Sequence, residues 1–209
     1  MKAENELVKY PRTLHFPWSN WTSDDKVLKS IDNFVGKQVV VTEKMDGENF
    51  NGYCDYAHAR SLSPLTGDDR GSAKAIWSNV SWKIPVGYRF CGENLYAKHS
   101  IHYFNLKSYL QFFSIWNESN ICLSWEETEK QLEELGLCSV PVLYKGVWDE
   151  SKIRDFENID GEGYVVRVEQ SFHFSEFQNC VAKYVRPNHV QTTQHWRTQK
   201  IIPNQLAEK

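Results

Sequence analysis

The sequence predicts an α+β fold, in which antiparallel sheets form most of the core and a few helices flank them. Three observations predict it: short runs of β-branched and aromatic residues recur along the chain, one segment has a clear helical pattern, and 41% of the 209 residues are apolar. A chain of this length can bury a hydrophobic core of its own. Because no repeat and no long Pro/Gly-rich linker divides it, we expect a single domain over residues 1–209.

The N-terminal part predicts irregular structure followed by a hairpin. Proline and tryptophan residues within the first thirty positions favour loops and short helical turns. Residues 37–44 are rich in valine and predict a strand that ends at the Asp46-Gly47 turn. We expect residues 50–59 to form the return strand of this hairpin, and residues 60–71 to be a polar loop.

The remaining elements are predicted from hydrophobic patterns and end signals. Four runs predict buried strands, at residues 88–92, 109–116, 163–169 and 180–185. The clearest helix is predicted between two capping signals: Ser124 and Glu127 match a capping box, and Gly136 suits the C-terminal stop.

Composition and charge exclude several classes of protein. The net charge of −3 gives no global positive field, which excludes a general nucleic-acid binder. Basic residues are nonetheless concentrated at the end of the chain, where residues 180–209 hold five basic residues and one acidic residue. No apolar run approaches the roughly 18 residues of a membrane span. Five scattered cysteines without a C-x-x-C pair predict reduced thiols, and with them a cytoplasmic, intracellular location.

The sharpest local signal for chemistry is residues 43–50, Glu-Lys-Met-Asp-Gly-Glu-Asn-Phe. It places Lys44 at the end of a predicted strand, directly before a tight turn, so that the amine projects from a rigid element. To act as a nucleophile this amine must lose a proton, although a free lysine titrates near pH ~10.4. Partial burial and a neighbouring cation would favour the neutral amine. Taken alone, the same residues also fit a surface hairpin with incidental charges.

Three further segments follow in order, and each joins charged residues to a predicted strand. Glu93 follows an apolar run and a glycine, and Glu162 lies between two glycines at the entrance to another strand. Glycines at such positions let backbone and ligand approach closely. The last strand carries Lys183 and leads to Arg186, and strand alternation predicts that Lys183 and Tyr184 face opposite sides.

Together these segments resemble the covalent nucleotidyltransferases, the superfamily of ATP-dependent RNA and DNA ligases and mRNA capping enzymes. The resemblance rests on four ordered motifs between residues 39 and 190: Lys-x-Asp-Gly, a glycine-flanked glutamate, an acidic-Gly-hydrophobic strand and a late lysine strand. It implies an ATP-grasp-like nucleotidyltransferase (adenylation) domain, in which antiparallel sheets with flanking helices surround an ATP cleft.

Position 49 distinguishes the branches of this superfamily. DNA ligases and capping enzymes generally carry arginine two residues after the Asp-Gly, whereas this chain has Asn49. The pattern Glu43-Lys44-x-x-Gly47-x-Asn49 is similar to the RNA ligase 2 family, which includes phage RNA ligases and trypanosomal editing ligases. Arg60 resembles the additional arginine of that family, which contacts phosphate or the polynucleotide end.

The resemblance implies a role for each matching residue. Lys44 would attack the α-phosphate of ATP and become a lysyl-adenylate, while Lys183 would neutralise charge on that phosphate. Glu162 would hold Mg²⁺ or Mn²⁺, or the waters of the metal ion. For the nucleotide, the resemblance assigns the adenine amino edge to Glu43, the ribose hydroxyls to Glu93, the phosphates or the metal's water shell to Asn49, and phosphate contacts to Arg60 and Arg186.

The resemblance places the aromatic residue that stacks on adenine at Phe113. Family members usually carry aspartate after this aromatic, where the chain has Ser114, and Phe112 is the adjacent candidate. Both phenylalanines also fit plain core positions, because many core aromatics mimic a stacking residue.

The chain departs from the family pattern in two places. Members often have two lysines spaced by one residue in the last motif, whereas both positions two residues from Lys183 are valine, and Arg186 is the nearest substitute. Members usually carry a further C-terminal domain, whereas here residues 187–209 are a short basic C-terminal extension. Its His189 and Trp196 fit a small docking surface for nucleic acid.

The expected activity is ATP-dependent joining of RNA 3′-hydroxyl and 5′-phosphate ends through a lysyl-AMP intermediate and an adenylated RNA 5′ end. The substrates would be RNA ends or a nicked duplex, and the enzyme is either a monomer or dependent on a partner protein. One alternative is a DNA ligase or a capping-type enzyme, against which Asn49 argues. The other is a non-catalytic RNA- or nucleotide-binding module, against which the intact set of Lys44, Glu93, Glu162 and Lys183 argues.

Overall fold

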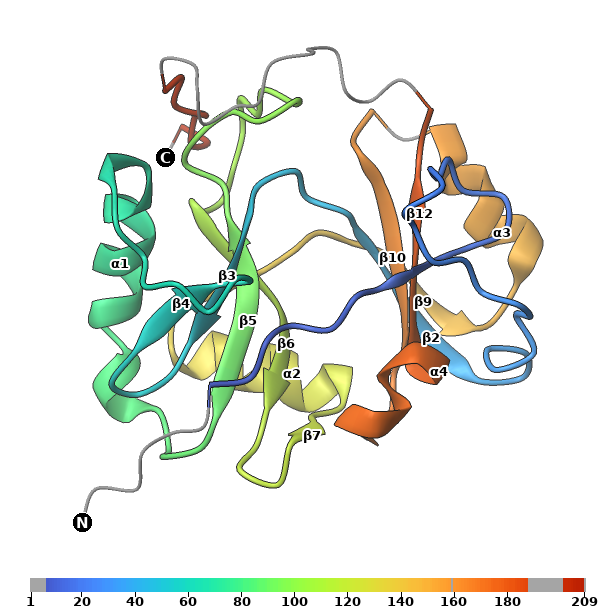
Figure 1. Cartoon of the computed structure of the whole chain (residues 1–209), viewed down its shortest axis with the longest axis horizontal. Coiled ribbons are helices and arrows are strands. Elements are labelled where there is room, and N and C mark those ends of the chain that lie inside the picture. Colours follow the sequence, from blue (N-terminus) through green and yellow to red (C-terminus); the bar gives the residue numbers. More distant parts are fainter. Residues whose placement is uncertain (1–6, 159, 188–200, 209) are drawn as a thin grey trace.

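The computed structural model describes residues 7–158, 160–187 and 201–208, and the strands in this part form two sheets that lie side by side (Figure 1). Sheet A contains, in order, β1 (Leu14–His15), β12 (Val181–Val185), β10 (Gly163–Val168), β2 (Gln38–Glu43) and β9 (Val142–Val147). Sheet B contains, in order, β11 (Phe172–His173), β7 (Ile121–Cys122), β6 (Leu110–Trp116), β5 (Arg89–Asn94), β3 (Glu48–Gly52) and β4 (Ala57–Ala59), with β8 (Cys138–Ser139) beside β6. Apart from β1–β12 and β6–β8, the pairings are antiparallel, which confirms the predicted α+β class.

Short helices flank the two sheets. Within the described ranges they are α1 (Gly71–Ser78), α2 (Trp125–Glu134), α3 (Glu150–Arg154) and α4 (Phe177–Cys180), with 3₁₀ turns at Asp68–Arg70, Ser81–Lys83, Asp155–Asn158 and Phe174–Glu176. Helix α2 confirms the predicted end signals. The Ser124 hydroxyl accepts a hydrogen bond from the Glu127 N–H, and the Glu127 carboxylate accepts one from the Ser124 N–H. Gly136 has φ +66°, the left-handed conformation that ends a helix.

The predicted hairpin at Asp46-Gly47 is wrong. β2 belongs to sheet A and β3 to sheet B, so the turn carries the chain from one sheet to the other (Figure 1). The neighbours of β2 are β10 and β9, which leaves no edge of β2 for β3. Gly47 is required for another reason, because a Cβ atom at this position would lie 2.5 Å from the Asn94 carbonyl oxygen.

The core has a part on each sheet. On sheet A, the side chains of Val39 and Val41 pack with Phe16, Phe34 and Tyr164. On sheet B, a second cluster contains Phe50, Trp77, Phe90 and Phe112. Because side chains alternate along β2, Val40 and Thr42 lie on the opposite face, which is turned toward sheet B. The predicted site residues of sheet A lie on this face.

Both ends of the described chain pack against the two sheets or the loops between their strands. The N-terminal residues 7–13 are irregular, as predicted, and cross from sheet B to sheet A before β1 pairs with β12 (Figure 1). Residues 201–208 pack on the loop between β5 and β6. The predicted docking residues His189 and Trp196 lie outside the described residues.

The structure also bears on the cysteines and on the question of membrane-spanning helices. The five cysteines all lie in the described part, and none of them forms a disulfide; Cys91, Cys122 and Cys180 are buried. Among the described residues, no helix has the length and apolar character that crossing a membrane requires.

Candidate active site

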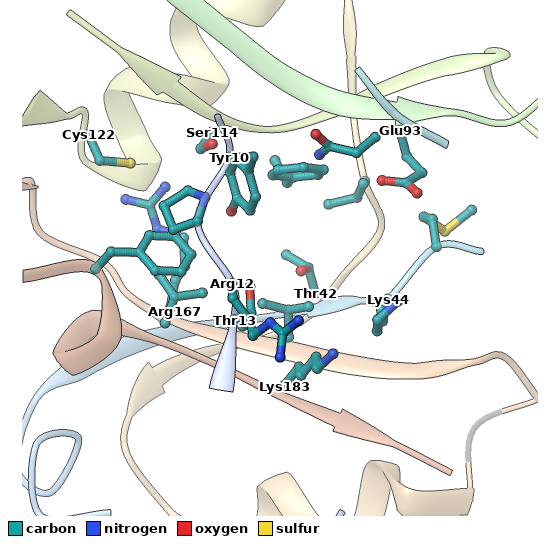
Figure 2. Close-up of a pocket in the computed structure, with 18 of the residues that line it drawn as sticks. Tyr10, Arg12, Thr13, Thr42, Lys44, Glu93, Ser114, Cys122, Arg167 and Lys183 are labelled. Carbon is teal, nitrogen blue, oxygen red and sulfur yellow. The ribbon is translucent and has the colours of Figure 1, made fainter. Parts of the chain in front are cut away.

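A cavity of about 340 Å³ lies between the two sheets, within the size range of small-molecule sites (Figure 2). Most of the predicted site residues line it: Glu43, Lys44, Asn49, Arg60, Glu93, Phe113 and Lys183. Glu162 lies in direct contact with Lys44, whereas Arg186 is not part of the cavity wall. Strands from both sheets therefore bring together residues that are far apart in the sequence.

The floor of the cavity is a row of side chains on neighbouring strands of sheet A. Val165 of β10 lies opposite Thr42 of β2 on one side and opposite Lys183 of β12 on the other. Lys44 is two residues beyond Thr42 and therefore lies on the same face. Its N–H donates to the Gly163 carbonyl over 2.9 Å, which fixes the backbone at the base of the amine.

Lys44 and Glu162 form a close, largely buried ion pair. The Lys44 Nζ lies 2.6 Å from the Glu162 Oε2, and the two side chains are 24% and 11% exposed. Burial acts to lower the Lys44 pKa, but the charges of Glu162 and Glu93 outweigh it, so the pKa is raised above that of a free lysine. A neighbouring cation would favour the neutral amine, whereas the carboxylates beside Lys44 favour the charged ammonium.

Glu93 faces Lys44 from sheet B (Figure 2). Burial raises the pKa of Glu93 to about 8, although the charge of Lys44 acts in the opposite direction. Asn49 of β3 lies directly opposite Glu93 of β5, which places both side chains on the cavity side of the sheet. The Asn51 side-chain amide donates to the Asn49 Oδ1 over 2.8 Å and so fixes which way the Asn49 amide points.

Lys183 is the second lysine of the cavity. Burial, and then the nearby charge of Lys44, lower the pKa of Lys183. On the other face of β12, Tyr184 stacks on Tyr164 with ring centroids 4.9 Å apart, which confirms the predicted alternation. The two lysines thus differ. The carboxylates stabilise the charge of Lys44, whereas burial and the charge of Lys44 disfavour the charge of Lys183. An anion bound beside Lys183 would therefore stabilise its charged form.

The structure separates the two candidate stacking residues. Phe112 is fully buried in the core of sheet B, whereas Phe113 is half-buried and lines the cavity. Ser114, which stands where the family usually has aspartate, is buried and accepts a hydrogen bond from the Trp116 indole N–H over 3.1 Å. Of the two candidates, Phe113 is therefore the one that a ligand in the cavity can contact.

The two predicted phosphate-binding arginines lie in different places. Arg60 follows β4, lines the cavity, and donates from Nε to the Tyr10 carbonyl over 3.3 Å. The Arg186 N–H donates to the Glu162 carbonyl over 3.0 Å, and its Nε donates to the Gly161 carbonyl. Among its described contacts, Arg186 therefore supports the turn that carries Glu162.

Sequence reasoning missed several residues of the cavity wall. Tyr10 and Arg12 come from the N-terminal segment, and both line the cavity (Figure 2). Arg167 of β10 is 4% exposed and lines the cavity, and its Nη1 has no hydrogen-bond partner among the described residues. Arg167 had a local signal, since it alternates with Val166 on a strand already assigned to the site. Tyr10 and Arg12 had none, because loop residues show no periodicity.

The carboxylates at Lys44 suit a Mg²⁺ or Mn²⁺ ion that takes its other ligands from water and substrate. Within the described residues, no group of three or more Asp, Glu, His or Cys side chains could hold a metal ion. Glu162 and Glu93 offer carboxylate oxygens, the donors that these hard cations prefer. Mg²⁺ commonly uses one or two carboxylates and completes its shell with water and substrate phosphates, so these residues fit such an ion.

A sequence model of the RNA ligase family matches residues 37–185 of the chain. A search of curated proteins found no match. Among solved structures, 26 chains match.

Three of these structures illustrate the likeness. Naegleria gruberi RNA ligase with PPi has a TM-score of 0.58 at 15% identity and is covered over 61% of its length, with 87% of this chain aligned. An archaeal ATP-dependent RNA ligase has a TM-score of 0.54 at 20% identity, with 82% of this chain and 48% of that one aligned. A mutant of the Naegleria gruberi enzyme with ATP and Mn has a TM-score of 0.54 at 14% identity, with 77% and 53% aligned. The chain thus spans about half of the structures that it matches, and at these identities the likeness shows the fold.

Proposed function

The chain belongs to the RNA ligase family, and from this premise we propose that it is an ATP-dependent RNA ligase that works through an adenylate on Lys44. One observation carries the proposal. The Lys44 amine is held 2.6 Å from Glu162 at a cavity whose walls also carry Glu93, Lys183 and an accessible Phe113. The proposal thus has a nucleophile, two carboxylates, a second cation and a stacking surface around one cavity of the size of small-molecule sites.

The nucleotide would lie across the cavity from Phe113 toward the two lysines. Phe113 offers a ring for adenine, and Glu43, at the end of β2, offers a carboxylate for the adenine amino edge. Burial raises the pKa of Glu43. Glu93 is placed to accept hydrogen bonds from the ribose hydroxyls, and Asn49, next to it, to contact the phosphates.

The first step would transfer AMP from ATP to the enzyme. Lys44 must give up one proton before it attacks, and the Glu162 Oε2 is the acceptor nearest to its Nζ. The Nζ then forms a bond to the α-phosphorus while the bond from that phosphorus to the bridging oxygen breaks, and pyrophosphate leaves with the electron pair. Lys183 would stabilise the negative charge that develops on the α-phosphate oxygens.

Mg²⁺ or Mn²⁺, held by Glu162 through oxygen or water, would supply Lewis-acid neutralisation of the phosphate charge. The ATP and Mn in solved relatives support this requirement. During AMP transfer the protein would orient the Lys44 amine. It would also keep Glu93 and Lys183 on opposite sides of the nucleotide.

The later steps would take place on RNA. An oxygen of the RNA 5′-phosphate attacks the lysine-bound phosphorus, the N–P bond breaks, and AMP passes to the RNA end. A 3′-hydroxyl then attacks the 5′-phosphate, loses its proton, and displaces AMP as the phosphodiester forms. Arg60, at the cavity and within reach of its opening, would hold a phosphate of the RNA.

The test is an end-joining assay with purified protein. RNA with a 3′-hydroxyl and a 5′-phosphate, single-stranded or nicked in a duplex, is incubated with Mg²⁺ or Mn²⁺ and either ATP or GTP. We expect the wild type to join RNA with ATP but not with GTP, and Lys44→Ala to join none. Lys37→Ala should join RNA normally, because Lys37 is an exposed lysine just before the same strand. Sealing of DNA nicks in preference to RNA, or the use of GTP, would support the DNA ligase or capping alternative instead.

A further inference from the structure

The segment 201–208 forms a built interface with the loop that connects β5 to β6. The Asn204 N–H donates to the Tyr96 carbonyl over 2.8 Å, and the Gln205 N–H donates to the Tyr103 carbonyl over 2.9 Å. The Gln205 carbonyl accepts from the Leu106 N–H over 3.0 Å. In Figure 1 this segment lies at the red end of the chain, beside the green loop. The segment is thus paired to the loop on both sides of Asn204.

Asn204 is the centre of this interface. It is 1% exposed, although both flanking residues are exposed. Its Nδ2 donates to the Leu95 carbonyl over 2.8 Å, and its Oδ1 accepts from the Tyr103 N–H over 2.9 Å. One amide therefore joins the start of the loop to its middle. Removal of this amide would leave the buried Leu95 carbonyl unsatisfied, at a cost of about 1–3 kcal/mol, and would also leave the part-buried Tyr103 N–H without its partner.

The same loop holds the turn that follows Lys44. The Asp46 Oδ2 accepts from the N–H groups of Ser100 and Ile101, over 2.7 and 2.8 Å. The Asp46 N–H in turn donates to the Tyr103 hydroxyl over 2.9 Å. Three hydrogen bonds thus tie the loop to a residue only two positions from the nucleophile, and the aspartate of the Lys-x-Asp-Gly motif has a structural partner.

We propose that Asn204 is a positioning residue that acts through the loop and Asp46 to hold the Lys44 amine in line for attack. The inference rests on the proposed function for its effect on catalysis. Asn204 does not line the cavity, so it would not touch the nucleotide. Its effect is to fix the loop that holds Asp46, and with it the turn after Lys44, on the side away from the cavity. A displacement of about 1 Å at a reacting group can cost on the order of 10²-fold in rate.

The test measures the first step alone. Single-turnover formation of the enzyme adenylate is followed over a range of ATP concentrations, well below the thermal midpoint of every variant. We expect Asn204→Ala to slow the step about 10- to 100-fold at saturating ATP, with the half-saturating ATP concentration changed by less than about threefold. Asn204→Asp keeps the acceptor for the Tyr103 N–H and should recover part of the rate. Gln205→Ala, an exposed neighbour whose bonds are through its backbone, should match wild type.

A second variant guards against a protein that fails to fold. Tyr103→Phe leaves the Asn204 interface intact and removes only the hydroxyl that accepts from Asp46, and it should slow the same step in the same way. A rate within twofold of wild type for Asn204→Ala, or a loss expressed wholly as weaker ATP binding, would overturn the positioning role.

Hydrogen exchange separates this inference from the proposed function. The Ser100 and Ile101 N–H groups should exchange slowly in wild type and at least tenfold faster in Asn204→Ala, whether or not the protein ligates RNA. If wild type forms no adenylate, the proposed function fails, while exchange alone decides whether the segment holds the loop. Equal protection in the two proteins would overturn the structural link itself.

Discussion

The rings of Tyr10 and Phe113 meet edge to face, with centroids 5.2 Å apart and planes at 72°. Such a contact contributes about 0.5–1.5 kcal/mol beyond the buried area and fixes the orientation of both rings. The Tyr10 ring also meets the Phe177 ring edge to face, with centroids 5.5 Å apart. Burial raises the pKa of the Tyr10 hydroxyl, which keeps this hydroxyl neutral. The N-terminal segment is thereby a wall of the cavity and presents Phe113 in a defined position to a ligand.

The two neighbouring phenylalanines should respond to substitution in different ways. Phe113→Ala removes the proposed stacking surface, and at about 1–3 kcal/mol for base–aromatic stacking the KM for ATP should rise roughly 5- to 150-fold. Phe112→Ala instead opens a hole in the core and should lower the free energy of unfolding by about 3–5 kcal/mol. Adenylation kinetics and urea denaturation of both variants check this. An unchanged KM for Phe113→Ala would contradict the placement of adenine.

Lys183 should matter for the rate of AMP transfer more than for ATP binding. Lys183→Met keeps the length of the side chain and removes the charge proposed to stabilise the α-phosphate, so adenylation should slow by about 10²- to 10³-fold. Rapid-quench measurement of adenylate formation at saturating ATP gives this rate directly. Lys152→Met, on exposed α3, is the matched control and should leave it unchanged. A Lys183→Met enzyme with the wild-type rate would exclude the assigned role.

Arg60 should act on RNA through charge. If it contacts one phosphate of a single strand, Arg60→Ala should reduce the slope of log binding constant against log salt concentration by about 0.7. Fluorescence anisotropy with labelled 5′-phosphorylated RNA at several salt concentrations measures this slope. Arg154→Ala removes a charge from exposed α3 and should leave the slope as it is. An identical slope for Arg60→Ala and wild type would rule out the phosphate contact.

Stability should depend on pH through His15. Burial, and then the charge of Lys183, lower the pKa of His15 to about 4, although Asp25, 3.3 Å from its Nε2, acts in the opposite direction. The unfolded histidine binds its proton more tightly, with a pKa of ~6.5. The stabilisation by the neutral ring is therefore complete above pH 6.5 and is lost as pH falls toward 4.

This loss should reach up to about 3 kcal/mol between pH 7 and pH 4. Urea denaturation across that range should show a shallower decline for His15→Gln than for wild type. Parallel declines would mean that His15 is not the group responsible.

The sequence allowed the residues that meet at the cavity to be picked out because each stands at a strand with its own local signal. Lys44, Glu93 and Glu162 adjoin strands beside glycines, and Lys183 alternates with Tyr184. The capping box of α2 is equally local, since Ser124 and Glu127 satisfy each other's backbone groups. Such signals depend on neighbours along the chain and therefore survive without knowledge of the fold.

The rest depended on contacts between distant segments. The Asp46-Gly47 turn looks like a hairpin in sequence, but β2 is already paired on both sides, and only the fold reveals this. Tyr10 reaches Phe113, and Asn204 reaches Tyr103, across about a hundred positions of chain. No periodicity marks a loop residue for such a contact, so neither residue could be predicted from the sequence alone.

The most direct test of the central claim is transfer of label from ATP to Lys44. The protein is incubated with Mg²⁺ and ATP labelled at the α-phosphate, then denatured, and the chain is examined for acid-labile label and the mass of one AMP. We predict label on wild type that peptide mapping places at Lys44, release of the label by added pyrophosphate, and none on Lys44→Ala. Absence of label on folded wild-type protein, or equal label on Lys44→Ala, would contradict the account.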